Sequence, residues 1–172
     1  FDVTDSTDVL LLFIDTTPLI DKYRVGNEYP DAPKQSVENQ LRWIDNTLKN
    51  SMEKWKIVMG HHPVYAGTTK DESERTDLQT RLLPILEKHK VDVYYNGHIH
   101  NFQHINTTGS SIDYFVISSA SQSREVVPPE GAVFTSSSTG FALCSLNDTV
   151  LITTLVDKTG NIIYQHTRKK LH

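Results

Sequence analysis

The sequences KIVMGHHP at residues 56–63 and VYYNGHIH at residues 93–100 decide how this chain is expected to fold. Each one is a short apolar run, which predicts a buried β-strand, followed at once by glycine and histidine, which end a strand rather than extend it. In an open α/β sheet the carboxyl ends of neighbouring parallel strands gather at one edge, where ligands bind. We therefore expect the histidines after the two strands to lie close together.

The segments before and between these sequences alternate between strand and helix patterns. The expected elements are a buried strand at 9–14, a charged loop at 21–34, a helix capped by Ser36 and ending near Asn50, a polar loop at 67–74 and a helix from Leu78 to His89 interrupted by Pro84. A strand, helix, strand order of this kind is typical of βαβ units in a layered α/β domain.

Beyond Asn106 the pattern changes to strands without helices. Strands are expected at 112–118, 141–146, 150–156 and 162–167, and a long loop at 118–139. The short turns between the later strands predict antiparallel pairing. The expected fold class is therefore mixed α/β (α+β), with a βαβ part followed by antiparallel strands in one mixed sheet or in two packed sheets.

The composition limits the function classes. The chain has 172 residues, 37% of them hydrophobic, a net charge of -4 and one cysteine, Cys144. This length suits one core without disulfides, and the negative charge excludes a protein whose main partner is nucleic acid. No apolar run approaches the roughly 20 residues of a membrane span, so no membrane partner is expected. Because the chain starts at Phe1 rather than methionine, we expect it to be a piece of a longer protein.

The histidines are the candidates for chemistry. Neutral imidazole is the commonest metal ligand, although a single histidine at the end of a strand is more often a satisfied structural residue. If the backbone stays extended, His98 and His100 point to the same side, and His62 points away from His61. The three imidazoles of His61, His98 and His100 are then expected to serve one metal site, or two ions about 3.5–4 Å apart.

The sequence Val58-Met-Gly-His61, with Pro63 and Tyr65, and the sequence Gly97-His-Ile-His-Asn101 resemble the VxxH and GHxH motifs of purple, tartrate-resistant-type acid phosphatases. These enzymes belong to the calcineurin-like metallophosphoesterases. The order and spacing of the two motifs and their flanking helices also match. The resemblance implies that residues 1–172 are the C-terminal half of a four-layer α/β/β/α sandwich that hydrolyses phosphate monoesters.

The resemblance also implies a dinuclear metal centre, iron paired with iron, zinc or manganese. His61 and His98 would bind the divalent ion and His100 the other, usually ferric, ion. Tyr65 would line the substrate entrance, Asn101 would shape the rim of the site, and His62 would lie at the rim or in the core. The family's location implies an extracellular, periplasmic or lysosomal protein.

Three earlier motifs of that family, which carry the bridging aspartate and the proton donor, do not occur in this sequence. Three imidazoles without oxygen ligands suit two cations poorly, and hard ferric iron least of all. We therefore expect the chain to bind metal poorly alone, to need the N-terminal half as its partner, and to self-associate through uncovered apolar surface. No catalytic acid is assigned. The alternative is a non-catalytic module that binds a single zinc ion or a partner protein.

Three further residues have expected roles other than metal binding. Asp15 follows a strand but lacks the family's glycine, and it is expected to be structural. Lys70 stands where some relatives have a histidine that helps to bind phosphate, so the substrate preference is expected to differ. His104 is expected to take part in ring packing rather than in metal binding.

Overall fold

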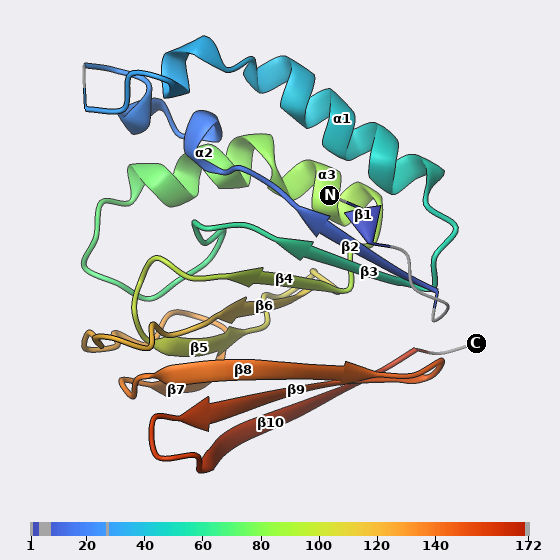
Figure 1. Cartoon of the computed structure of the whole chain (residues 1–172), viewed down its shortest axis with the longest axis vertical. Coiled ribbons are helices and arrows are strands. Elements are labelled where there is room, and N and C mark those ends of the chain that lie inside the picture. Colours follow the sequence, from blue (N-terminus) through green and yellow to red (C-terminus); the bar gives the residue numbers. More distant parts are fainter. Residues whose placement is uncertain (1, 4–7, 27, 171–172) are drawn as a thin grey trace.

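The computed structural model describes residues 2–3, 8–26 and 28–170. These residues form three layers, with helices on one face of a large mixed sheet and a small antiparallel sheet on its other face (Figure 1). The mixed α/β class, with antiparallel strands in its second part, is confirmed. The described residues supply three layers of the four-layer sandwich that the resemblance implies.

The large sheet places the carboxyl ends of four parallel strands at one edge. Its strands are β1 (Asp2–Val3), β2 (Val9–Phe13), β3 (Trp55–Met59), β4 (Val93–Asn96), β5 (Phe102–Ile105), β6 (Asp113–Val116) and β7 (Ala132–Ser136), in the order β1-β2-β3-β4-β6-β5-β7. Strands β2, β3, β4 and β6 run parallel, and β1, β5 and β7 run antiparallel to their neighbours. The segments that follow β3 and β4 therefore start side by side, as the sequence predicts.

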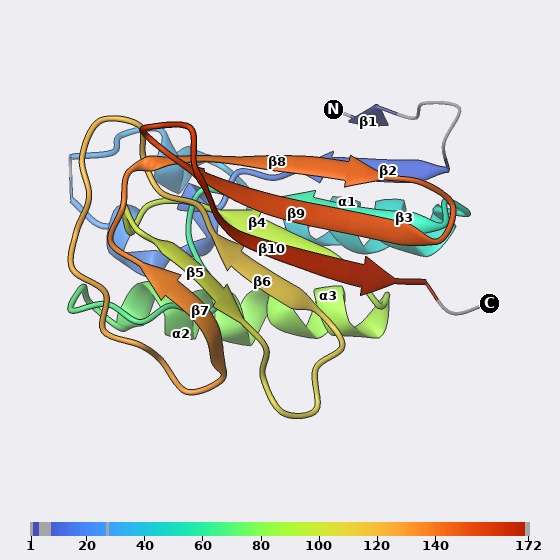
Figure 2. The same ribbon diagram turned by 90° about the horizontal axis from the view of Figure 1, so that it is seen from below.

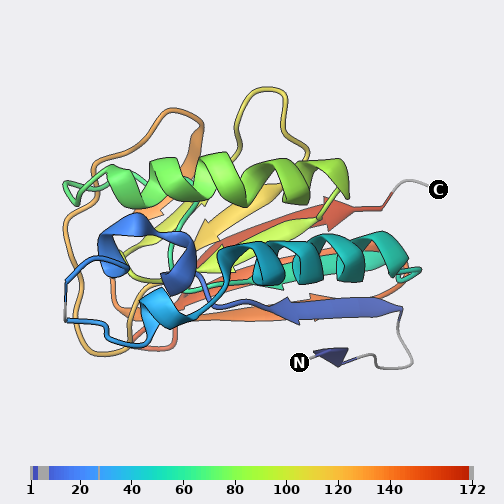
Figure 3. The ribbon, with the colours of Figure 1, turned by 90° about the horizontal axis from the view of Figure 1, so that it is seen from above.

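Helices α1 (Val37–Asn50), α2 (Ser73–Arg81) and α3 (Leu83–Lys88) cover one face of this sheet (Figure 3). The Oγ of Ser36 accepts a hydrogen bond from the backbone N–H of Asn39 at 3.2 Å, which confirms the expected cap of α1. Pro84 lies in the first turn of α3, so the interrupted helix expected from the sequence is two helices. The expected charged loop holds two of three short 3-10 helices, which span Thr17–Leu19, Asp21–Tyr23 and Ala32–Lys34.

The small sheet consists of β8 (Gly140–Leu146), β9 (Val150–Asp157) and β10 (Ile162–Lys169), in the order β10-β9-β8. It lies against the face of the large sheet that the helices leave free (Figure 2). All its pairs are antiparallel, as expected. The apolar side chains buried between the two sheets are Val9, Trp55, Ile57, Val93, Tyr95, Phe115 and Leu151.

Three strands, the two-residue β1 and the strands β5 and β7, and one pairing differ from the sequence-based expectation. Strand β5 was not expected because it contains the polar residues Gln103 and His104, although all four of its side chains are buried. The Gln103 amide is buried because it bonds with the backbone N–H and C=O of Gly67, at 2.7 and 2.8 Å. Strand β7 lies inside the segment expected to be a loop, and it pairs only with β5. Strand β6 pairs in parallel with β4, because the chain crosses from β4 through β5 before it returns.

A buried ionic network joins the two sheets. The carboxylate of Asp113 on β6 lies 3.2 Å from the Nε2 atoms of His104 and His166, and it accepts a hydrogen bond from Arg168 Nη1 at 2.9 Å. Burial opposes ionisation of Asp113, but these hydrogen bonds hold its pKa well below the usual range. The ring of His104 stacks on Phe115 with a centroid distance of 4.2 Å, so the expected ring packing is confirmed.

None of the helices in the described residues is long and apolar enough to cross a membrane.

Candidate metal centre

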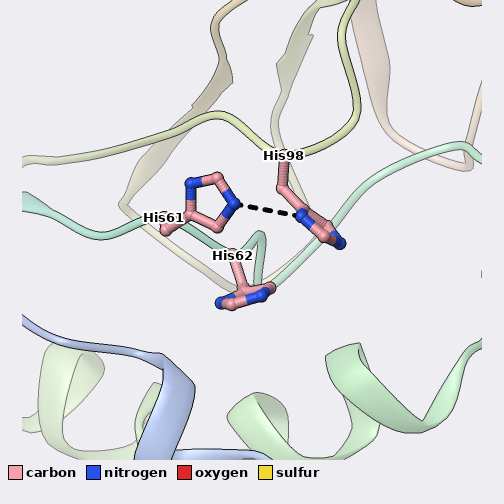
Figure 4. A group of neighbouring side chains, drawn as sticks. All are labelled: His61, His62 and His98. Atoms are coloured by element: carbon pink, nitrogen blue, oxygen red, sulfur yellow. Dashed lines mark hydrogen bonds between the residues drawn. The ribbon is translucent and has the colours of Figure 1, made fainter. Parts of the chain in front are cut away.

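The structure brings together the histidines that follow the two neighbouring parallel strands β3 and β4. His61 Nε2 lies 3.1 Å from His98 Nδ1, and the two ring centroids are 5.0 Å apart (Figure 4). His61 is exposed, and His98 is half-buried. The two nitrogens are at hydrogen-bond distance, and the same approach allows both to bind one ion when neither carries a proton.

His62 is the third imidazole of the group. The group consists of one ring nitrogen each from His61, His62 and His98, all within 4.8 Å of one another (Figure 4). The ring centroids of His62 and His98 are 4.4 Å apart. The expectation that His62 points away is wrong, because strand β3 ends at Met59 and the chain turns at Gly60. A Cβ on Gly60 would lie 2.5 Å from Tyr94 Oη, so only glycine fits this close approach.

The backbone at His98 and His100 also differs from the expectation. Their φ angles are +66° and +63°, in the left-handed region, so the argument from extended backbone does not hold. Non-glycine residues adopt this conformation at a cost, and such residues cluster at functional sites. His100 lies outside the group of three imidazoles, and its Nδ1 is buried without a hydrogen-bond partner. Its role as a metal ligand stays a prediction.

A buried carboxylate orients His98. Glu74 on α2 places Oε2 2.9 Å from His98 Nε2, and its Oε1 accepts hydrogen bonds from Lys22 Nζ and Tyr23 Oη, both at 2.7 Å. Burial opposes ionisation of Glu74, but the hydrogen bonds from Lys22 and Tyr23 lower its pKa to about 2. When His98 Nε2–H donates to the ionised Glu74, Nδ1 carries no proton and faces His61. No pattern in the sequence singled out Glu74.

Lys70 lies beside the same ring. Its Nζ is 2.9 Å from His98 Nε2 and donates a hydrogen bond to the His98 carbonyl oxygen at 3.0 Å. Burial lowers the pKa of Lys70, and so does the charge of Arg124. The sequence placed Lys70 in a loop, where some relatives have a histidine that helps to bind phosphate, but it did not predict this contact with His98. The structure shows that it competes with Glu74 for one nitrogen of His98.

The three imidazoles are neutral at pH 7. Burial, with smaller contributions from neighbouring charges, lowers the pKa of His62 to about 3 and that of His98 to about 4. Partial desolvation of its ring, with the charge of Lys70, lowers the pKa of His61. Protons therefore compete weakly with a metal ion for these nitrogens at neutral pH.

The two other expected site residues, Tyr65 and Asn101, make no hydrogen bond with the three imidazoles in the part of the chain that the structure describes. Tyr65 lines a cavity of about 430 Å³ whose wall also includes Arg75 and Thr107 but none of the three histidines. Asn101 is fully buried, and its Oδ1 accepts a hydrogen bond from Gln103 at 2.8 Å. Contact of either residue with a substrate stays a prediction.

The donor set fits a divalent metal of the zinc type. The converging nitrogens belong to three imidazoles with lowered pKa values, so they are neutral and can bind a cation at pH 7. Imidazole suits zinc and similar divalent ions, whereas ferric iron prefers oxygen ligands. The group at this edge of the sheet contains three imidazoles and no carboxylate. A second ion that prefers oxygen ligands, such as ferric iron, therefore needs carboxylates from other residues.

Comparison with known proteins decides the family. The family model described as calcineurin-like phosphoesterase matches residues 5–102, which include both strand ends with their histidines. The chain belongs to the calcineurin-like phosphoesterase family. Purple acid phosphatase 4 of Arabidopsis thaliana is 30% identical over 98% of this chain and 52% of its own length. Purple acid phosphatase 3 of the same plant is 31% identical over 94% of this chain and 47% of its length.

Solved structures support this calcineurin-like phosphoesterase fold. GAP50, titled the anchor in the inner membrane complex of Plasmodium, has a TM-score of 0.76 at 23% identity over 95% of this chain and 50% of its own. The purple acid phosphatase PPD1 of yellow lupin seeds has a TM-score of 0.66 at 16% identity, over 95% and 31%. The expected relationship to purple acid phosphatases is confirmed, and the chain spans about half the length of the curated relatives named above.

Proposed function

We propose that this chain supplies the nitrogen ligands of a metal centre that hydrolyses phosphate monoesters. One observation carries the proposal: in a member of the calcineurin-like phosphoesterases, His61 and His98 follow adjacent parallel strands and face each other at 3.1 Å. This edge of the sheet is where α/β folds place their ligand sites. The substrate would be a phosphate ester whose charged oxygens face the metal.

When bound, metal ions in such a centre lower the pKa of water and neutralise charge on the phosphoryl oxygens. The residues of this chain hold and orient that centre. His61 and His98 bind the divalent ion, and Glu74 holds the Nε2 proton of His98 so that Nδ1 faces inward. Lys70 places an ammonium group next to His98, where it adds positive charge beside the position of an anionic ester.

Other parts of the protein would complete the site. The proposed partner is the N-terminal half of the same domain, which would bring the oxygen ligands for a second ion and bridge the pair. Apolar surface is uncovered along one side of the sandwich, where Phe13 on β2 is 48% exposed and Leu143 on β8 is 55% exposed. Strands β2 and β8 follow the same side of the molecule in Figure 2. Self-association through this surface is expected when the partner is missing.

The metals and the compartment are part of the same proposal. Iron paired with iron, zinc or manganese follows from the relationship to purple acid phosphatases, with His100 on the ferric ion. A location outside the cytoplasm, extracellular, periplasmic or lysosomal, also rests on this relationship. No general acid is assigned among the described residues.

One observation favours a second candidate function. Because the converging groups are imidazoles alone, the chain could act as a non-catalytic module that binds a single zinc ion or a partner protein. Metal content separates the two. Two ions per complete site, the second bound only when the missing half is supplied, support the phosphatase, whereas a single ion both with and without that half supports the module.

The test uses the full-length gene product, loaded with iron and zinc, and p-nitrophenyl phosphate. We expect hydrolysis by the full-length protein and none by residues 1–172 alone. His61→Ala and His98→Ala should each lower kcat/KM by more than the ~100-fold that loss of an outer-shell partner costs. His89→Gln is the matched control, since His89 precedes β4 and therefore lies toward the opposite edge of the sheet, where it contacts Asp45. A full-length protein that binds two ions but hydrolyses nothing, or robust turnover by residues 1–172, rejects the proposal.

A further inference from the structure

We propose that His62 is a metal ligand together with His61 and His98, so that residues 1–172 hold one divalent ion of the zinc type without help from another segment. This inference deepens the proposed metal centre and rests on it, but it does not depend on phosphatase activity. It differs from the sequence-based expectation in two ways. His62 replaces His100 in the set, and the isolated chain binds metal well.

The spacing of the nitrogens supports a shared ion. A zinc ion lies about 2.0–2.1 Å from each imidazole nitrogen, so two ligands of a tetrahedral site are about 3.3 Å apart. The 3.1 Å between His61 Nε2 and His98 Nδ1 already meets this requirement. One ring nitrogen of His62 lies within 4.8 Å of both, and the proposal requires it to move to about 3.3 Å from each when the metal binds. The fourth position of the tetrahedron remains open for water or an anion.

The protein fixes His62 in place for this role. Its Nδ1 lies 2.8 Å from Thr16 Oγ1, and the same oxygen accepts the backbone N–H of His62 at 3.1 Å. Tyr94 Oη donates a hydrogen bond to the His62 carbonyl oxygen at 2.8 Å. When Nδ1–H donates to Thr16, the lone pair of Nε2 is free. Histidine ligands commonly donate their other N–H to an oxygen acceptor in this way, which sets the tautomer and the ring orientation.

Glu74 performs the same task for His98, and Lys70 opposes it. Donation from His98 Nε2–H to Glu74 Oε2 leaves Nδ1 unprotonated and ready to bind metal. Donation from Lys70 Nζ to Nε2 instead requires a proton on Nδ1, which blocks the metal position. The Lys70 charge also repels a bound cation. Glu74 therefore favours metal binding, and Lys70 limits its strength.

The experiment is zinc titration of residues 1–172 at pH 7 by calorimetry, with single alanine variants. We expect one zinc ion per chain. His62→Ala should weaken binding at least tenfold, as His61→Ala and His98→Ala do, whereas His100→Ala should change it less than twofold. Lys70→Met should strengthen binding severalfold. The control His89→Ala, at the opposite edge of the sheet, should leave the affinity unchanged.

The opposite ranking overturns the proposal: strong loss in His100→Ala with no loss in His62→Ala, or no zinc binding by the wild-type chain. Because His62 is buried, its alanine variant could lose the fold, so a second measurement uses the wild-type chain. Cobalt(II) should give the intense visible absorption of a tetrahedral ion, and zinc should shift the ¹⁵N resonance of His62 Nε2. An unshifted His62 resonance in zinc-loaded protein rejects its role as a ligand. None of these outcomes depends on hydrolysis by the full-length protein, so the two proposals fail separately.

Discussion

Replacement of Asp113 by asparagine tests the ionic network between the sheets. The Asp113 side chain is 3% exposed, and its carboxylate contacts His104, His166 and Arg168, from β5 and β10. Asparagine keeps the shape and one oxygen acceptor but removes the negative charge. Arg168 then keeps Asp92 as a partner, with Nε 3.2 Å from Oδ1, so it is not left without a counter-charge.

The expected loss is about 3 kcal/mol in the free energy of unfolding. Removal of one partner from a buried ion pair costs about 3–5 kcal/mol. We expect the low end, because Arg168 and His166 are 21% and 26% exposed and because Arg168 retains Asp92. For a chain of this size, that loss lowers Tm by about 6–12 °C.

The assay is urea unfolding followed by circular dichroism, at pH 7 and at pH 3. The folded-state pKa of Asp113 is lowered, so its carboxylate stabilises the protein above the unfolded pKa of about 3.9, and this contribution is lost as the pH falls below that value. The difference between wild type and variant should therefore shrink at pH 3. Asp148→Asn, at an exposed position of the β8–β9 turn, is the control and should change stability by less than about 0.5 kcal/mol. A similarly small change in Asp113→Asn at pH 7 refutes the reasoning.

Three further predictions concern the metal edge of the sheet. Glu74→Gln should weaken zinc binding about 10–100-fold in calorimetry while the circular dichroism spectrum stays unchanged, since it removes the negative charge that holds the Nε2 proton of His98. Equal affinity contradicts this role. Gly60→Ala should lower the free energy of unfolding in urea by about 1–3 kcal/mol, because its Cβ would meet Tyr94 and a Thr16 methyl group. Gly97→Ala is the control, because its Cβ would meet nothing nearer than 3.8 Å. Zinc affinity should change by no more than a few fold between pH 7 and about pH 6, because the pKa values of His62 and His98 in the folded protein are about 3 and about 4. A steep fall in affinity over that interval contradicts these pKa shifts.

The sequence predicts the parallel part of the fold because that part is locally encoded. The apolar runs before Gly60 and Gly97 match β3 and β4, and the cap at Ser36 matches the start of α1. Parallel strands bring their carboxyl ends together whatever the loops do, so the meeting of His61 with His98 follows from these patterns.

The sequence fails where distant residues decide the structure. Strand β5 carries buried Gln103 and His104, whose partners Gly67 and Asp113 come from other segments, so its pattern does not look like a strand. The turn after Met59 brings His62 inward, although extended backbone predicts the reverse. Glu74 reaches His98 only because α2 packs beside the site. Such contacts depend on tertiary packing, which neither spacing nor composition encodes.

The central claim is that histidines after β3 and β4 bind a common metal ion. An X-ray absorption spectrum at the zinc edge of the zinc-loaded chain tests it most directly. The account predicts nitrogen atoms at about 2.0–2.1 Å from the zinc ion and outer-shell scattering from three imidazole rings. This outer-shell scattering should fall when His61 or His98 is replaced by alanine. A first shell of oxygen alone, or an imidazole signal that both replacements leave unchanged, contradicts it.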